Sequence, residues 1–191
     1  GGAEFGEVFL SDVWVPDAHR LGGVGEGWPV VLDTLMNERA AIGDDLLPDV
    51  ETARALITPR TRAIALVTPN NPGGVEYPAE LVRAFYDLAR DAGITLMVDE
   101  TYRDFDSRTG APHALFQQDG WQDTFIHLYS FSKAYRLTGH RVGALAASPA
   151  RLAEVEKFLD TVAICPGQIG QYAALWGLEN LSQWVAGERD E

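Results

Sequence analysis

Apolar residues between positions 44 and 191 form short continuous runs that alternate with longer amphipathic stretches. The continuous runs predict buried strands over residues 63–67, 94–98, 125–129 and 142–147, the first of them fully buried. The amphipathic stretches predict helices over residues 50–57, 78–92, 149–162 and 167–178. Pro78 and Gly93 stand just inside the start and just past the end of the second helix, where helices favour them. Strands separated by helices predict an α/β fold with a mostly parallel sheet flanked by helices.

The first 43 residues follow a different pattern. Apolar and polar residues alternate over residues 4–15, which predicts a strand, and residues 28–42 have the spacing of an amphipathic helix. Residues 21–27 contain four glycines, and a phosphate-binding loop is one interpretation, but no buried strand leads directly into them. We therefore expect a short strand–helix arm over residues 1–43, joined near residues 43–45 to an α/β domain over residues 44–191.

Polar residues follow each of the first three strands predicted for the α/β domain. They occupy residues 68–74, 99–102 and 130–133. Because right-handed crossovers place the carboxyl ends of parallel strands along one edge, these residues are expected to meet where such sheets bind ligands. Two structural alternatives stay open: residues 70–74 form a turn and nothing more, and Asp99 serves as a helix cap.

Lysine is rare in this chain, because thirteen of the 15 basic residues are arginine. Only Lys133 and Lys157 are lysines, and Lys133 has two serines within the three residues before it and Arg141 eight residues after it. A primary amine forms a Schiff base with an aldehyde, while hydroxyl and guanidinium groups bind phosphate. The stretch therefore predicts a site for an aldehyde cofactor that carries a phosphate. The alternative is a polar loop with one solvated lysine.

Charge and cysteine content narrow the range of partners. The net charge of -13 argues against nucleic acid and against anionic membrane surfaces. Cys165 is the single cysteine, which suits a reducing compartment and predicts a cytoplasmic location. No apolar run approaches the roughly 20 residues of a membrane helix, and no signal-peptide pattern opens the chain. Since the chain does not start with Met, we expect an internal piece of something longer.

Part of the predicted arm resembles acyl-CoA dehydrogenases. The resemblance rests on Phe9-Leu-Ser-Asp-Val-Trp-Val-Pro16, Leu21-Gly22, Gly25-Glu-Gly-Trp28 and Leu35-Met-Asn-Glu-Arg-Ala-Ala-Ile-Gly43. In that family these segments join the middle β-domain to the C-terminal helical domain. The flavin-contacting strands and the helix with the catalytic carboxylate have no counterpart here, so we expect no flavin chemistry.

Residues 44–191 resemble the class I/II pyridoxal-phosphate aminotransferases of fold type I, through motifs in that family's order and spacing. Asn71, in Asn71-Pro-Gly-Gly74, matches the asparagine that hydrogen-bonds the phenolic oxygen of the cofactor. Asp99 matches the aspartate that pairs with the pyridine nitrogen. Tyr102 matches the tyrosine that also contacts the phenolic oxygen. Gly73 is a departure, because the family commonly has threonine there.

The third segment of the resemblance, Ser130-Phe-Ser-Lys133, carries the reactive amine. Lys133 matches the Schiff-base lysine of the family. Ser130 and Arg141 match phosphate ligands, and Ser132 is adjacent to them. The resemblance therefore implies that Lys133 is catalytic and that these four residues, with Asn71, Asp99 and Tyr102, bind pyridoxal 5′-phosphate.

The implied reaction is transfer of an amino group from an amino acid to a 2-oxo acid, in a parent family of homodimers. Three alternatives stay open: a lyase, decarboxylase or synthase of the same fold, a non-catalytic chimeric fragment, and, more distantly, an acyl-CoA dehydrogenase. The family's phosphate loop, its ring-stacking aromatic residue and its carboxylate-binding arginine have no counterpart in this incomplete large domain. We expect no metal site, and we interpret His113, His127 and His140 as structural.

Overall fold

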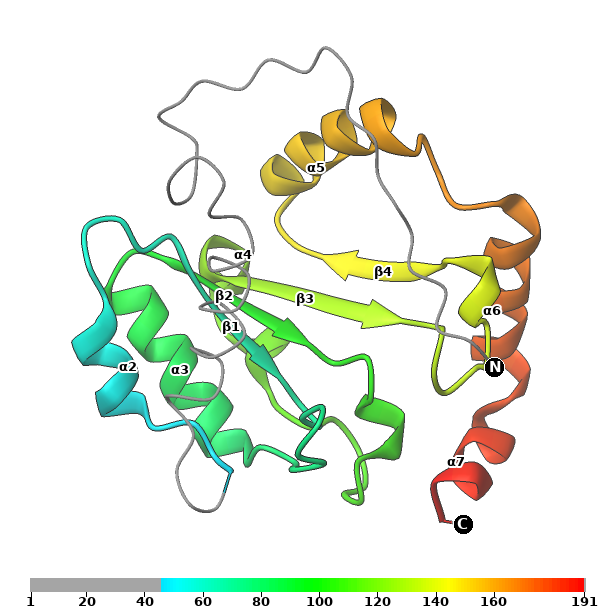
Figure 1. Ribbon diagram of the computed structural model, residues 1–191, viewed down its shortest axis with the longest axis horizontal. Coiled ribbons are helices and arrows are strands. Elements are labelled where there is room, and N and C mark those ends of the chain that lie inside the picture. Colours follow the sequence, from blue (N-terminus) through cyan, green and yellow to red (C-terminus); the bar gives the residue numbers. More distant parts are fainter. Residues whose placement is uncertain (1–45, 191) are drawn as a thin grey trace, which may run out of the picture. The chain divides into compact units, whose positions relative to one another are not determined.

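The computed structural model describes residues 46–190, so the predicted arm, its junction and its acyl-CoA-dehydrogenase-like motifs lie outside the described residues. Four strands form one sheet in the order β1-β2-β3-β4. They are β1 (Ala63–Val67), β2 (Thr95–Asp99), β3 (Phe125–Ser130) and β4 (Gly143–Ala146). The first three strands are parallel, and β4 runs antiparallel to β3 (Figure 1). The fold is the predicted α/β class with a mostly parallel sheet flanked by helices.

Helices separate the strands as the sequence pattern indicates. The four predicted helices correspond to α2 (Val50–Leu56), α3 (Ala79–Asp91), α5 (Pro149–Val162) and α6 (Gln168–Asn180). The structure adds short elements that the pattern did not predict: α4 (Trp121–Thr124), η2 (Arg103–Phe105), η3 (Leu115–Gln117), η4 (Thr138–His140) and α7 (Ser182–Asp190). Four of these five span only one turn, which is too short for a helical period to appear in the sequence.

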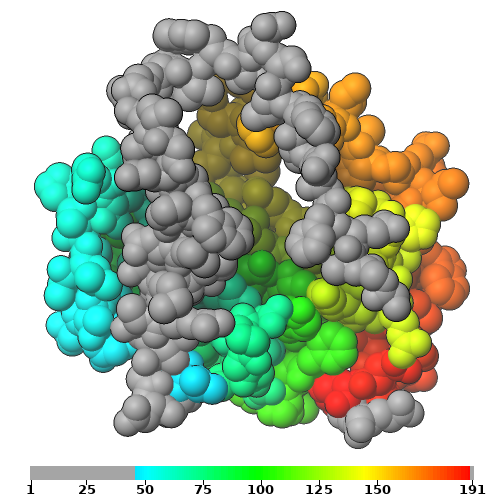
Figure 2. All heavy atoms as spheres, viewed as in Figure 1, coloured from blue at the N-terminus to red at the C-terminus, as the bar shows by residue number. Residues whose placement is uncertain are grey.

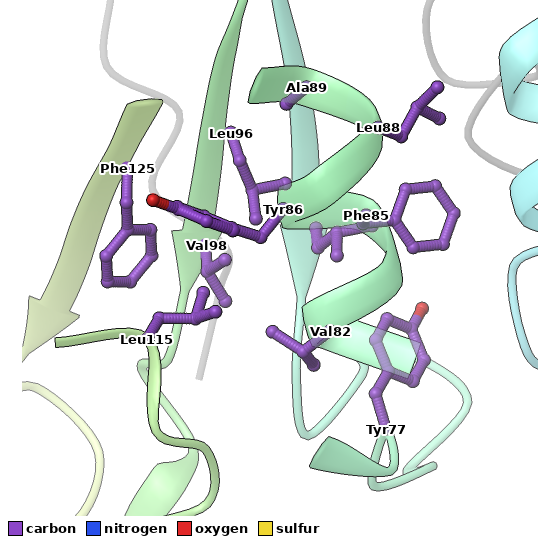
Figure 3. Close-up of a cluster of buried hydrophobic side chains, with 11 residues drawn as sticks. Tyr77, Val82, Phe85, Tyr86, Leu88, Ala89, Leu96, Val98, Leu115 and Phe125 are labelled. Carbon is purple, nitrogen blue, oxygen red and sulfur yellow. The ribbon is translucent and has the colours of Figure 1, made fainter. Parts of the chain in front are cut away.

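Helix α3 forms the main packing layer against β1 and β2 (Figure 3). Pro78 precedes its first turn, and Gly93 follows its end with a φ of 65°, a left-handed conformation that glycine adopts without steric cost. The core cluster comprises Leu66, Tyr77, Val82, Phe85, Tyr86, Leu88, Ala89, Leu96, Val98, Leu115 and Phe125. The apolar stripe predicted for residues 78–92 thus lies in the core.

The prediction that the strand over residues 63–67 is fully buried is wrong. Leu66 is only 6% exposed, whereas Ala63 and Ala65 in the same strand are exposed. Burial also alternates in β2, where Leu96 and Val98 face the core. Successive side chains of a strand point to opposite faces of the sheet, and the α3 layer covers the face that carries Leu66. A continuous apolar run therefore did not distinguish a strand covered on one face from a strand covered on both.

The apolar side chains of α5 and α6 are largely exposed. No residue of α5 is buried, and Phe158 and Val162 on it are 67% and 65% exposed. Helix α6 buries only small residues, among them Gly170, where a Cβ would lie 2.7 Å from a methyl group of Val142. The orange atoms in Figure 2, which belong to the end of α5 and the start of α6, lie at the surface. An apolar surface of this kind marks an interaction site or an aggregation risk.

We predict that this surface binds hydrophobic dyes and drives association. Replacing Trp176, which is 57% exposed, with glutamate is expected to lower the fluorescence of bound anilinonaphthalene sulfonate and to raise the monomer fraction in analytical ultracentrifugation. Leu56→Glu is the matched control, because Leu56 is 64% exposed but lies on α2. An equal response to both substitutions would contradict a localised surface.

No helix among residues 46–190 has the length and apolar character needed to cross a membrane.

Candidate cofactor-binding site

The loop after β1 is a tight turn that exposes Asn71. The side-chain oxygen of Asn70 accepts a hydrogen bond from the backbone N–H of Gly73 at 3.1 Å. The backbone carbonyl of Asn70 accepts a second one from the backbone N–H of Gly74 at 2.6 Å. Asn71 is left free to reach outward, and its Nδ2 atom donates to the hydroxyl of Tyr102 at 3.3 Å. The loop is therefore a turn, as its composition predicts. It also brings Asn71 into contact with Tyr102, another predicted site residue.

Asp99 is the last residue of β2. Its Oδ1 atom accepts hydrogen bonds from the backbone N–H and the hydroxyl of Thr101, at 2.9 and 2.6 Å. The nearest following helix is η2, whose N-cap is Tyr102 with no side-chain capping bond, so Asp99 caps a turn and not a helix. The Oδ2 atom of Asp99 makes no hydrogen bond within the part of the chain that the structure describes. One carboxylate oxygen thus orients the group and the other is available to a ligand.

Lys133 lies beside the aromatic ring of Tyr102. Its Nζ atom is 5.7 Å from the centroid of the Tyr102 ring, a distance at which an ammonium group and an aromatic face attract each other. Lys133 is exposed and forms no ion pair with any described residue, whereas Nζ of Lys157 lies 2.6 Å from a carboxylate oxygen of Glu154. The structure therefore brings Asn71, Tyr102 and Lys133 together from three separate loops.

The predicted phosphate ligands lie where β3 ends and β4 begins. The Oγ atom of Ser130 accepts a hydrogen bond from the backbone N–H of Ser132 at 3.2 Å. Ser130 pairs with Gly143 across the sheet, which places Arg141 at the same end of the two strands. Arg141 is exposed and donates to the carbonyl of Thr138 at 3.1 Å, and no hydrogen bond joins it to either serine among the described residues.

Arg141 has an unusual backbone for a residue with a side chain, with a φ of 52°. A left-handed conformation of this kind costs about 1–3 kcal/mol and is enriched at functional sites. It turns the chain from η4 into β4 directly beside the serines.

A cavity of about 260 Å³ opens beside Asn71 and Tyr102, and none of the other five predicted site residues lines it. Its wall is formed by residues of the loop after β1, together with Glu76, Tyr102 and Phe105. A larger cavity of about 580 Å³ lies beside the start of α6, and none of the predicted site residues lines it. The smaller cavity is the one associated with the candidate site.

Sequence reasoning missed a buried charge next to Asp99. Glu100 is 1% exposed, and its Oε2 atom lies 2.7 Å from Nε2 of His127. Nε2 of His113 lies 3.1 Å from the Oε1 atom without hydrogen-bond geometry, and Nη1 of Arg103 lies 3.5 Å from Oε2. Burial raises the pKa of Glu100, but the two histidines outweigh burial and lower the pKa to about 2. The sequence signal for its burial was its position, because Glu100 continues the alternation of core-facing residues along β2.

Comparison with protein families shows to which family the chain is similar. Residues 37–190 match the family model for aminotransferases of class I and II. Among curated proteins, the chain is 32% identical over 149 residues to the aromatic aminotransferase ISS1 of Arabidopsis thaliana, covering 74% of this chain and 36% of that protein. It is 29% identical over 172 residues to the aspartate aminotransferase of Thermotoga maritima, covering 90% of this chain and 44% of that protein.

Solved structures agree with the sequence comparison. The aromatic aminotransferase of Pyrococcus horikoshii aligns with a TM-score of 0.71 at 27% identity, covering 78% of this chain and 40% of that one. The aspartate aminotransferase of Thermus thermophilus aligns with a TM-score of 0.68 at 26% identity, covering 76% and 38%. The chain spans less than half the length of these curated relatives. Members of the matched family use pyridoxal 5′-phosphate. Because the family model covers most of its residues, this chain belongs to the class I and II aminotransferases.

Proposed function

We propose that this chain forms the cofactor edge of a pyridoxal-phosphate-dependent aminotransferase, which transfers an amino group from an amino acid to a 2-oxo acid. The observation that carries the proposal is the convergence of Asn71, Tyr102 and Lys133, which follow three different strands and meet through two contacts. A solvated lysine in a polar loop needs no such convergence.

The chemistry of the donor set fits pyridoxal 5′-phosphate. The amine of Lys133, which is unpaired among the described residues, suits an aldehyde. The Oδ2 atom of Asp99, which accepts no hydrogen bond from a described residue, suits a protonated ring nitrogen. The neutral donors Asn71 and Tyr102 suit a phenolic oxygen. The hydroxyl groups of Ser130 and Ser132 and the guanidinium group of Arg141 suit a phosphate. Each functional group of the cofactor thus has a matching side chain at this edge.

When bound, the cofactor supplies an aldehyde that takes up amines and a ring that accepts electrons. Lys133 would hold the cofactor through its aldehyde group, and its free amine would move a proton at the substrate Cα. Asp99 keeps the ring nitrogen protonated, and Thr101 fixes the orientation of its carboxylate. Arg141 and the two serines orient the whole group by its phosphate.

The substrate is an amino acid whose side chain this proposal leaves open. The curated relatives include aromatic, aspartate and glutamate–pyruvate aminotransferases, so the family name alone selects none of these classes. A homodimer in the cytoplasm is part of the same proposal. The family resemblance supports the homodimer. The single cysteine, which is exposed and free, supports a reducing compartment such as the cytoplasm.

The test of the proposal is a half-reaction. The chain is incubated with pyridoxal 5′-phosphate and, in turn, with aspartate, alanine and phenylalanine, and chromatography measures pyridoxamine 5′-phosphate and the matching 2-oxo acid. The expected result is formation of both products in equal amounts, faster than with free cofactor. Carbon dioxide release without a 2-oxo acid would point instead to a decarboxylase, and product formation at the rate of free cofactor would contradict the proposal.

We predict that Arg141→Gly weakens cofactor binding and leaves the fold intact. Glycine adopts the left-handed conformation without strain, so the free energy of unfolding should stay within about 1 kcal/mol of the parent. Loss of a charge-assisted contact to phosphate should raise the Kd for pyridoxal 5′-phosphate roughly 10- to 100-fold, as measured by fluorescence titration.

The matched control is Arg136→Gly. Arg136 also has a positive φ, of 54°, but its guanidinium group pairs with Glu188 and lies over Trp184. We expect this variant to keep the parent's cofactor affinity. If both glycine variants bind the cofactor equally well, Arg141 is not a phosphate ligand.

A further inference from the structure

The buried cluster of Glu100, His113 and His127 lies beneath the candidate site, on the core side of the sheet. Its members come from three elements: the residue after β2, the loop before η3, and β3. All three are buried, and isolated ionised groups are costly to bury unless they are paired. Glu100 and His127 are hydrogen-bonded to each other, and His113 lies 3.1 Å from the same carboxylate. Buried polar groups that are paired in this way fix a specific geometry.

Glu100 is joined to the site through its neighbours in the chain. Its backbone N–H donates to the carbonyl of Leu128 at 2.9 Å, which extends the pairing of β2 with β3 by one residue. Its carbonyl accepts from Arg103 at 3.0 Å, and the guanidinium group of Arg103 also lies 3.5 Å from its carboxylate. Tyr102 lies inside the turn that these contacts close.

Asp99 and Glu100 are adjacent and therefore point to opposite faces of the sheet. A strand end that slipped by one residue would exchange the two carboxylates between the core and the ligand edge. His127 and His113 oppose this exchange because they give a partner to a carboxylate only at the core-facing position. Asp106 and Arg108 form a separate ion pair near this end of the sheet.

We propose that Glu100 is a positioning residue for the cofactor edge: held by His127 and His113, it keeps Asp99 facing the ligand side and keeps Tyr102 at hydrogen-bond distance from Asn71. The role in cofactor binding rests on the proposed function. The contacts themselves are present in the cofactor-free chain. Glu100 acts through Asp99 and Tyr102 and touches no reacting atom.

The test compares variants of the cluster by two readouts. The first readout is the side-chain amide signal of Asn71 in the cofactor-free chain, measured by ¹⁵N NMR. The second is the ratio of Lys133 to Lys157 labelling when pyridoxal 5′-phosphate is trapped with borohydride. Glu100→Gln and His127→Leu are expected to shift the Asn71 signal and to lower the labelling ratio at least about ten-fold, because small displacements of positioned groups have effects of that size. His127→Gln keeps a donor and is expected to stay near the parent in both readouts.

Asp106→Asn is the matched control, because it removes a buried carboxylate that pairs with Arg108 and not with the histidines. It is expected to lower stability without moving either readout. If Glu100→Gln and His127→Leu also change only stability, the positioning role is wrong. Should Glu100→Gln fail to fold, a difference between His127→Leu and His127→Gln supports the role and equality of the two overturns it. If the parent chain does not label Lys133, the proposed function fails, and the Asn71 signal alone decides the positioning role.

Discussion

Replacing Lys133 with arginine is expected to reduce the half-reaction to the rate of free cofactor, a loss of at least about 100-fold relative to the parent. Arginine keeps the positive charge and can still lie over the ring of Tyr102, so the local packing should survive. Its guanidinium group cannot take the place of the amine, because it stays protonated in proteins and neither holds an aldehyde nor moves a proton at Cα. The measurement is the initial rate of pyridoxamine 5′-phosphate formation from the most reactive amino acid.

Lys157→Arg is the control for this substitution. Lys157 lies on α5 and is paired with Glu154, and it does not line the cavity beside Asn71 and Tyr102. Its replacement should leave the rate unchanged. If the Lys133 variant keeps the parent's rate and the Lys157 variant loses it, Lys157 and not Lys133 is the reactive lysine.

Acidification is expected to destabilise the fold through Glu100. The folded-state pKa of about 2 lies below the ordinary value of 4.5, so the stabilisation is fully present above pH 4.5 and is lost as the pH falls toward 2. This difference corresponds to about 3 kcal/mol, of which about 2 kcal/mol should be lost between pH 6 and pH 3. Urea unfolding followed by circular dichroism at these two pH values measures the loss.

Glu100→Gln separates this contribution from the other carboxylates. Glutamine does not titrate, so the variant should lose about 2 kcal/mol less than the parent between pH 6 and pH 3. Asp106→Asn removes a different carboxylate with a lowered pKa, which its hydrogen bond with Arg108 causes. A parallel pH dependence in the parent and in Glu100→Gln would show that Glu100 is not held as the ionised form.

The four strands and four of the helices were accessible from the sequence because each of them carried its own period or punctuation. Helix α3 is the clearest case, since Pro78 and Gly93 mark its ends and its apolar stripe lies in the core. The burial of β1 was not accessible, because a run of small apolar residues is compatible with one covered face or two. Only the packing of α3 onto one face decides between them.

The candidate site was predicted as a set of residues at the ends of strands, and the structure adds how they touch. The contacts of Asn71 and Lys133 with Tyr102 depend on loop conformations that no sequence period encodes. The Glu100 cluster was missed for a similar reason, since His113 and His127 are separated from it by 13 and 27 residues. Pairings over such distances follow from the sheet register and not from local spacing.

Cofactor trapping shows whether the site residues form an assembled cofactor edge. The purified chain is incubated with pyridoxal 5′-phosphate, reduced with borohydride and digested, and mass spectrometry locates the modified amine. Lys133, Lys157 and the N-terminal amine are the candidates. Selective labelling of Lys133 is the predicted result, because among the described lysines only its amine lies beside Tyr102, whereas the amine of Lys157 pairs with Glu154. Equal labelling of both lysines, or labelling of neither, would contradict an assembled cofactor edge.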